Sequence, residues 1–588
     1  MVFCGKPSKG CGECRSRKIR CDQGRPTCSQ CAKGNRVCPG YRDELSLMFR
    51  DESQQVVRKA KTGSSGRRNK KTTTVASKKP SSPEARNSSS PSTVGKDSPP
   101  TESTSSPPIN VGGDFADFNE FEEVQLINEE QLLQQGFVHV PRKVQPSWKL
   151  TVDEAVNYFL RHNVWPGAMF IMIEPKSGHP SATLSEQAQM AALVSVGTVM
   201  LSRLRRSKAL EIVAEREYGH ALTLLTRAVC DEEQSRANST LSTVLLLAIF
   251  EVITTRELKN IEKWTNHIYG AAALLELRGP EQLQTEEGLK LFVQLRFQII
   301  MSCLQRGMRV PQSLLECTKI AMYLRPQVDA YCDRLICITG KLSNLRADIH
   351  EKVIKDVNEK LSAAYALEAE LLAWVAAGPP NFQYTTYTCS SVEQWTRMFG
   401  NKPFPYNTQY HVYRDLWICH TWNQYRCARV IVCEIILSCL RRLSAASPAM
   451  AMSKELQTHC ARIRNIVREL VGDICASAAY HLGVEGSPAA AFAVPMNYCY
   501  VGGMLLLWPL ALAGGTEPIG HPLRIWIRNC LQIIGHSLGI DQAFAIVEVL
   551  EQEAGLFEGL EETASGVTFR PTGDASIHNK ILVGTWDG

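Results

Sequence analysis

Residues 11–38 read CGECRSRKIRCDQGRPTCSQCAKGNRVC, and the six cysteines in this stretch decide how the N-terminal part of the chain folds. Their spacing is C-x2-C-x6-C-x6-C-x2-C-x6-C, which is two copies of C-x2-C-x6-C displaced by 17 residues. A structural zinc site takes four tetrahedral ligands and is closed by cysteine thiolates. Six cysteines fill two such sites only if two thiolates each bridge both ions. The spacing therefore predicts two Zn²⁺ ions bound by Cys11, Cys14, Cys21, Cys28, Cys31 and Cys38.

The cellular compartment expected for this chain favours metal binding over disulfides at the six patterned cysteines. The chain has 21 cysteines, and those after residue 38 stand singly in apolar stretches, where a reduced cysteine acts as a small buried hydrophobe. The N-terminus has no apolar run of signal-peptide length, so we expect a reducing compartment. A dense, regular cysteine pattern there indicates a metal site. Cys4 lies outside the pattern and is expected to be free.

Charge is distributed unevenly along the 588 residues. The net charge is +6, but residues 1–80 contain 20 Lys and Arg against 6 Asp and Glu, so the rest of the chain is slightly acidic. A basic end on an acidic body indicates a polyanionic partner, either nucleic acid or an anionic membrane.

The two halves of the cysteine repeat differ in charge, which favours nucleic acid. The first loop contains Arg15, Arg17, Lys18 and Arg20, whereas the second contains only Lys33 and Arg36. Some Lys and Arg side chains of DNA-binding proteins pair with guanine in the major groove of double-stranded DNA, and other Lys and Arg side chains contact the phosphates. Some of these cations could instead balance the net charge of −2 that two Zn²⁺ and six thiolates would carry.

In all five spacings between its six cysteines, the stretch resembles the fungal six-cysteine binuclear zinc cluster regulators. The resemblance implies that Cys11 and Cys28 bridge both ions, with Cys14 and Cys21 completing one site and Cys31 and Cys38 the other. It also implies that Arg17 and Lys18 read a CGG triplet, while Arg15 and Arg20 contact phosphates. Pro26 matches a loop proline that orients the two halves in the family.

The segment after the cysteines predicts a linker. Residues 43–57 have helical character, but their apolar stripe is too short for a convincing coiled coil, so monomer and homodimer both remain open. Residues 58–149 form the predicted disordered linker, since at least their first fifty are rich in Ser, Thr, Pro, Lys and Arg and cannot bury enough surface to offset the ordering entropy. The cluster Arg67, Arg68, Lys70 and Lys71 predicts a nuclear localisation signal, or else a solvated charge run or an arm that contacts phosphates.

A short acidic-aromatic segment lies at residues 114–123, with the sequence DFADFNEFEE. Acidic residues keep aromatic side chains solvated and available to a partner, which is the logic of a segment that recruits transcription machinery or coactivators. The alternative is a tether whose three Phe dock on the protein's own body. The segment favours an activator, and a repressor with the same DNA module is the first rival.

Residues 150–588 predict an all-α domain. Apolar residues recur every three or four positions through much of it, and Gly279-Pro280 predicts a helix stop after Arg278. The apolar residues spaced four apart from Leu345 to Leu361 predict one helix with a solvent-exposed polar face. Residues 218–222, 245–251, 264–279 and 506–510 resemble the fungal-specific regulatory domain, which implies regulatory duty but supplies no ligand.

The sequence of this domain does not favour a catalytic or a membrane-spanning function. No nucleophile elbow, phosphate-binding loop or zinc-protease motif is present, so we do not expect an enzyme. His267 beside Trp264 is interpreted as a partly buried His and a core Trp on one helix. The uncharged stretch 486–516 contains several Pro and Gly, which favours two short buried helices over a membrane span.

The predicted fold is therefore a small binuclear zinc cluster DNA-binding module plus a large all-α regulatory domain, joined by a disordered linker. Residues 1–42 form the module, 43–57 a short helical linker, 58–149 the disordered linker and 150–588 the regulatory domain. The predicted function is a nuclear, zinc-dependent regulator of RNA polymerase II transcription. By resemblance its target is a secondary-metabolite gene cluster. A zinc-storing or redox-sensing protein that does not read DNA is the rival from another class.

Overall fold

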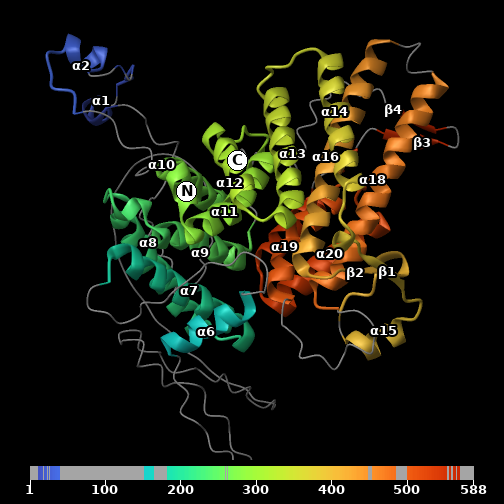
Figure 1. The fold of residues 1–588 in the computed structure, drawn as a ribbon, viewed down its shortest axis with the longest axis horizontal. Coiled ribbons are helices and arrows are strands. Elements are labelled where there is room, and N and C mark those ends of the chain that lie inside the picture. The colour runs from blue at the N-terminus through green and yellow to red at the C-terminus, as the bar shows by residue number, and fades with distance from the viewer. Residues whose placement is uncertain are drawn as a thin grey trace, which may run out of the picture. The chain divides into compact units, whose positions relative to one another are not determined.

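The computed structural model describes residues 11–17, 19–22, 24, 27–39, 151–163, 182–257, 260, 262–400, 402–447, 453–484, 499–552, 555–557, 560–563 and 566–569. They form a cysteine-rich module, residues 11–39, and a helical body, residues 151–569 (Figure 1). The fold class is the predicted one, a small cysteine module and a large, mostly helical domain. Cys4, the basic cluster at 67–71 and the acidic-aromatic segment 114–123 lie outside the described residues.

The cysteine-rich module contains two short helices, α1 (Gly12–Ser16) and α2 (Ser29–Lys33). Each begins directly after the first cysteine of a C-x2-C pair, so the two helices repeat the 17-residue displacement of the sequence. The buried interior of the module consists of cysteines, with Cys11, Cys14, Cys28 and Cys31 at its centre.

The helical body is built almost entirely from α-helices. In chain order the helices of the described residues are α6 (Val152–Asn163), α7 (Leu184–Arg205), α8 (Lys208–Val229), α9 (Asn238–Thr254), α10 (Glu262–Arg278), α11 (Glu286–Arg306), α12 (Gln312–Leu324), α13 (Gln327–His350), α14 (Val357–Ala376), α15 (Val392–Phe399), α16 (Leu416–Ala446), α18 (Lys454–His481), α19 (Cys499–Gly514), α20 (Pro522–Ile533) and α21 (Gln542–Gln552).

Local signals define where the first helices begin and end. Thr183 and Glu186 form a reciprocal capping box at the start of α7, with bonds of 3.3 and 2.9 Å between side chain and backbone. Helix α10 ends at Arg278, where Gly279 takes a φ of 64°, so the predicted stop is confirmed. Helix α9 is buried along most of its length and packs against α7 and α10, because residues 241–253 are mostly apolar.

Four long helices, α13, α14, α16 and α18, run side by side in the second half of the body (Figure 1). The longest, α16, has 31 residues and packs against α14 on one side and α18 on the other. Helix α19 lies against α16 and α18, and α21 returns to α9. Arg203 on α7 forms an ion pair of 2.8 Å with Asp541 just before α21, which joins the two ends of the body.

Two small antiparallel sheets interrupt the helical pattern of the described residues. Strands β1 (Thr385–Thr388) and β2 (Gln409–Val412) pair antiparallel, and so do β3 (Leu560–Thr563) and β4 (Gly566–Phe569). Side chains on β2 and just after it connect the β1–β2 sheet to the long helices by hydrogen bonds. His411 Nε2 lies 3.3 Å from Asp473 Oδ1 on α18, and the buried Arg426 on α16 donates to the Tyr413 hydroxyl at 2.9 Å.

One expectation about the helix boundaries of the body was wrong. The stripe from Leu345 to Leu361 is not one helix, because α13 ends at His350 and α14 begins at Val357, capped by Asp356. Val353 lies in the turn and is 62% exposed. Within 486–516, α19 forms one buried helix of 16 residues that runs through Pro509. Residues 486–498 lie outside the described residues, so the two predicted short helices stay a prediction. Among the described residues, no helix is both long enough and apolar enough to span a bilayer.

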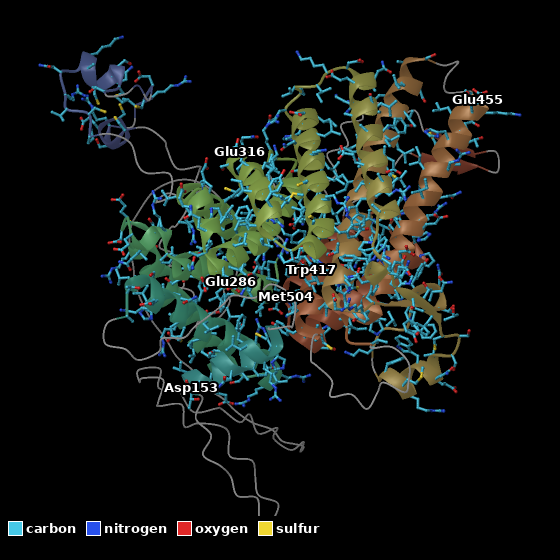
Figure 2. The ribbon with its side chains drawn as sticks, viewed as in Figure 1. Asp153, Glu286, Glu316, Trp417, Glu455 and Met504 are labelled. Atoms are coloured by element: carbon cyan, nitrogen blue, oxygen red, sulfur yellow. The ribbon has the colours of Figure 1, made fainter. Side chains whose placement is uncertain are left out.

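The pair Trp264 and His267 lies on α10 as predicted, but the burial is the reverse of the expected one, because Trp264 is half-buried and His267 is buried. His267 belongs to a buried hydrogen-bonded group. The Tyr218 hydroxyl lies 3.1 Å from His267 Nε2 and donates to Glu251 Oε1 at 2.6 Å. Burial lowers the pKa of His267 to about 4, so the ring is neutral and fits a core role. Acidic side chains such as Glu316 and Glu455 lie instead on the outside of the body (Figure 2).

Candidate metal centre and DNA-binding face

The six predicted cysteines meet between α1 and α2, where their sulfur atoms gather (Figure 2). They form two groups of four, and within each group all four Sγ atoms lie within 4.8 Å of one another. Cys11 and Cys28 belong to both groups. One group is completed by Cys14 and Cys21, and the other by Cys31 and Cys38.

The distances between sulfur atoms fit zinc and do not fit disulfides. Cys11 Sγ lies 3.7 Å from Cys28 Sγ and 3.7 Å from Cys31 Sγ, and Cys14 Sγ lies 3.7 Å from Cys28 Sγ. A tetrahedron with zinc–sulfur bonds of about 2.3 Å has sulfur atoms about 3.8 Å apart. A disulfide needs about 2.05 Å between its sulfur atoms, and none of the six cysteines forms a disulfide in the structure.

The C-x2-C pairs place two sulfurs of each half at the start of a helix. The Cys14 backbone N–H donates to Cys11 Sγ at 3.4 Å, and the Cys31 N–H donates to Cys28 Sγ at 3.4 Å. The two sulfurs that accept these bonds are the two that both groups share. Amide donors stabilise the negative charge of a thiolate, so the backbone supports the shared positions in both halves.

Burial makes the cluster dependent on a cation. The side chains of Cys11, Cys14, Cys28 and Cys31 are at most 1% exposed, while Cys21 and Cys38 are half-buried. Burial raises the pKa of Cys14 to about 12, and it raises the pKa of Cys28 and Cys31 as well. Without a metal these groups are thiols, whereas metal ligation requires thiolates. The donor set thus fits two Zn²⁺ ions, which would replace the protons.

Two further contacts connect the halves of the module. The Ser29 backbone N–H donates to the Asp22 carboxylate, with the N atom 3.0 Å from Oδ1 and 3.2 Å from Oδ2. This bond lowers the pKa of Asp22 below its ordinary value. Arg36 and Glu13 form a looser ion pair of 4.0 Å, in which both side chains are 35% exposed. Sequence reasoning missed both contacts, because neither carboxylate lies in the cysteine pattern.

The basic loop between Cys14 and Cys21 lies on the surface. Arg17 and Arg20 are exposed, and so is Ile19 at 42%. Lys18 and the Arg15 side chain lie outside the described residues. In the second loop Lys33 is exposed, but Arg36 is half-buried and engaged with Glu13. The difference in charge between the halves is therefore also a difference in the cations presented to solvent.

Comparison with protein families assigns both parts of the chain. Residues 9–46 match the fungal Zn(2)-Cys(6) binuclear cluster domain, and residues 179–550 match the fungal specific transcription factor domain. The chain belongs to the fungal binuclear zinc cluster transcription factors. The matched module binds two Zn²⁺ ions, and DNA is the partner of this family, which is a family of transcription regulators rather than an enzyme class.

Two curated relatives agree with the family. The chain is 31% identical over 199 residues to transcription factor dbaG of Emericella nidulans, in an alignment covering 33% of this chain and 44% of dbaG. It is 44% identical over 48 residues to transcriptional regulatory protein moc3 of Schizosaccharomyces pombe, covering 7% of this chain and 9% of moc3. The chain thus spans less than half the length of either relative. No solved structure matches it significantly.

Proposed function

We propose that this zinc cluster factor reads CGG-type triplets in double-stranded DNA through its Cys14–Cys21 loop. The observation that carries the proposal is the asymmetry of the module. Arg17 and Arg20 are exposed on the first loop, whereas the Arg36 guanidinium of the second is held near Glu13. A protein that only stored zinc or sensed redox state would have no use for a lopsided basic loop. The six cysteines serve as the zinc ligands, with Cys11 and Cys28 bridging.

Selection of random duplexes by the full-length, zinc-loaded chain tests this proposal. Enrichment of CGG-containing sites supports it, and the spacing of paired triplets also reports whether the chain binds as a monomer or a homodimer. If zinc is bound and no such site is enriched, the DNA-reading proposal fails, and a zinc-storing or redox-sensing function is favoured instead.

Within the loop, Lys18 and Arg17 are the proposed base-reading residues, and Arg15 and Arg20 hold phosphates. Lys18→Ala should leave zinc content intact and weaken specific binding by about 1–3 kcal/mol. Arg20→Ala is the matched control, because loss of a phosphate contact weakens binding to all sequences about equally. Wild-type affinity of Lys18→Ala for its selected site would reject this reading face.

The proposed output is activation of RNA polymerase II transcription in the nucleus. The acidic-aromatic segment supports an activator that recruits transcription machinery or coactivators, and the cluster Arg67, Arg68, Lys70 and Lys71 supports nuclear import. Fusing residues 109–145 to an unrelated DNA-binding domain tests the first point, since a silent reporter would favour a repressor. Replacing the four basic residues with Ala tests the second by fluorescence localisation.

The proposed division of the chain follows the same logic. Residues 1–42 bind DNA, 43–57 and 58–149 connect, and 150–588 regulate. Control of a secondary-metabolite gene cluster rests on family resemblance alone. Transcript profiling of a deletion strain tests it, because loss of co-regulated neighbouring genes supports the proposal and loss of scattered genes contradicts it.

A further inference from the structure

A carboxylate outside the cysteine set ties the two halves of the module together. Asp22 follows Cys21 directly, and both of its carboxylate oxygens lie within 3.2 Å of the Ser29 backbone N. Ser29 in turn follows Cys28, one of the two cysteines shared by both groups of four. The contact therefore joins the residue after Cys21, which belongs to one group, to the residue after Cys28, which belongs to both groups.

The internal repeat supplies no second copy of this contact. A displacement of 17 residues places Pro39 opposite Asp22 and Gly12 opposite Ser29. Proline has no carboxylate, so the equivalent bond between position 39 and position 12 cannot form. Of the two shared cysteines, Cys28 alone is followed by a residue whose amide is held in this way in the described part of the module.

We propose that Asp22 is a positioning residue of the zinc cluster, which holds the shared Cys28 thiolate in register with both ions through the Ser29 amide. This inference rests on the proposed assignment of the six cysteines as zinc ligands. Ser29 is the first residue of α2, so its N–H has no partner inside the helix and needs an outside acceptor. A carboxylate is a strong acceptor for such an amide.

The expected effect is on how firmly the ions are retained. Residues that orient a metal ligand from outside the ligand set typically contribute about 10–100-fold to metal affinity. Without the Asp22 contact the Ser29 amide is no longer held, and Cys28 beside it can leave both ions more easily. Release of zinc should therefore accelerate, although the ligands themselves are unchanged.

The experiment compares Asp22→Ala and Asp22→Asn in the full-length chain. Zinc content is measured first, and transfer of zinc to a chromophoric chelator is then followed in time. We expect Asp22→Ala to start with two ions per chain and to release them at least about 10-fold faster than wild type. Asp22→Asn retains an amide oxygen as acceptor, so its release rate should lie close to that of wild type.

Glu13→Ala is the matched control, since it removes one carboxylate from the same module. Its ion pair with Arg36 is long and one-third exposed, so it should contribute little, and release should match wild type. A wild-type rate in Asp22→Ala overturns the inference. So does equally fast release from Asp22→Asn or Glu13→Ala, because net charge rather than the contact would then be the cause.

Zinc content separates this inference from the ligand assignment. If wild type itself bound no zinc, the assignment of the cysteines would fail and the role of Asp22 would fail with it. If only Asp22→Ala were isolated without zinc, while Asp22→Asn retained both ions, the inference would be supported. Loss of zinc from both Asp22 variants, with wild type loaded, would overturn it.

Discussion

At the residue scale, the sharing of two sulfurs makes the six cysteines unequal. Cys28 belongs to both groups of four, whereas Cys38 belongs to one. Cys28→Ala should therefore lose both ions, and Cys38→Ala should retain about one, because its loss leaves the other group complete. Zinc per chain after dialysis, measured by mass spectrometry, checks this. Equal zinc loss in the two variants would contradict the shared arrangement.

The grouping of the six cysteines was predictable because their spacing restricts which of them can bind the same metal ion. The two cysteines of a C-x2-C pair at the start of a short helix can face one ion, and six cysteines complete two four-ligand sites only if two of them are shared. The role of Glu251 was not predictable. Its carboxylate accepts the Tyr218 hydroxyl across 33 residues of sequence, and no local pattern encodes a partner at that distance.

At the element scale, two glycines in neighbouring helices provide opposite tests of the packing. A Cβ on Gly197 of α7 would lie 2.0 Å from the Ala155 backbone oxygen of α6, whereas a Cβ on Gly219 of α8 would meet nothing within 4 Å. The first position therefore requires glycine for the close approach of α6, and the second does not.

Gly197→Ala should lower the free energy of unfolding by about 1–3 kcal/mol, because backbone atoms cannot move aside cheaply. Gly219→Ala should raise it by about 0.5–1 kcal/mol, since alanine favours the helix and no clash opposes it. Urea denaturation followed by far-ultraviolet circular dichroism measures both. Similar destabilisation of the two variants would be inconsistent with the described contact between α6 and α7.

Helices were predicted where their apolar runs are long, and boundaries were missed where the stripe continues across a turn. The i+4 pattern from Leu345 to Leu361 persists through residues 351–356, which are not helical. Asp356 caps α14 through the Asn358 amide at 3.2 Å, and this local bond defines the start of the second helix. The β1–β2 sheet was also missed, because only 4 residues pair in each strand and helix α15 lies between the two strands in the sequence.

At the scale of the whole molecule, buried neutral histidines make stability depend on pH. Burial lowers the pKa of His267 and His481 to about 4 and that of His420 to about 3, from an ordinary 6.5. In the unfolded chain these rings bind protons below pH 6.5, while the folded chain excludes them. Stability is therefore fully present above about pH 6.5 and is lost as the pH falls towards 4.

The midpoint of urea unfolding of the helical body should accordingly fall between pH 7.5 and pH 5. Circular dichroism at 222 nm reports on this body, because nearly all helical residues of the described chain lie in it. His267→Gln should reduce the difference between the urea midpoints measured at pH 7.5 and pH 5, because one titrating ring is removed. A midpoint that does not change between pH 7.5 and pH 5 would show that burial of these rings costs nothing.

The central claim is that two zinc ions organise a module whose Cys14–Cys21 loop reads DNA. The most direct measurement is the affinity of the full-length, zinc-loaded chain for a duplex containing a CGG triplet, compared with a duplex in which that triplet is scrambled. Each mismatched base pair typically costs about 1–3 kcal/mol, so the account predicts at least about 100-fold weaker binding to the scrambled duplex and loss of the preference on zinc removal. Equal affinity of the zinc-loaded chain for both duplexes would contradict it.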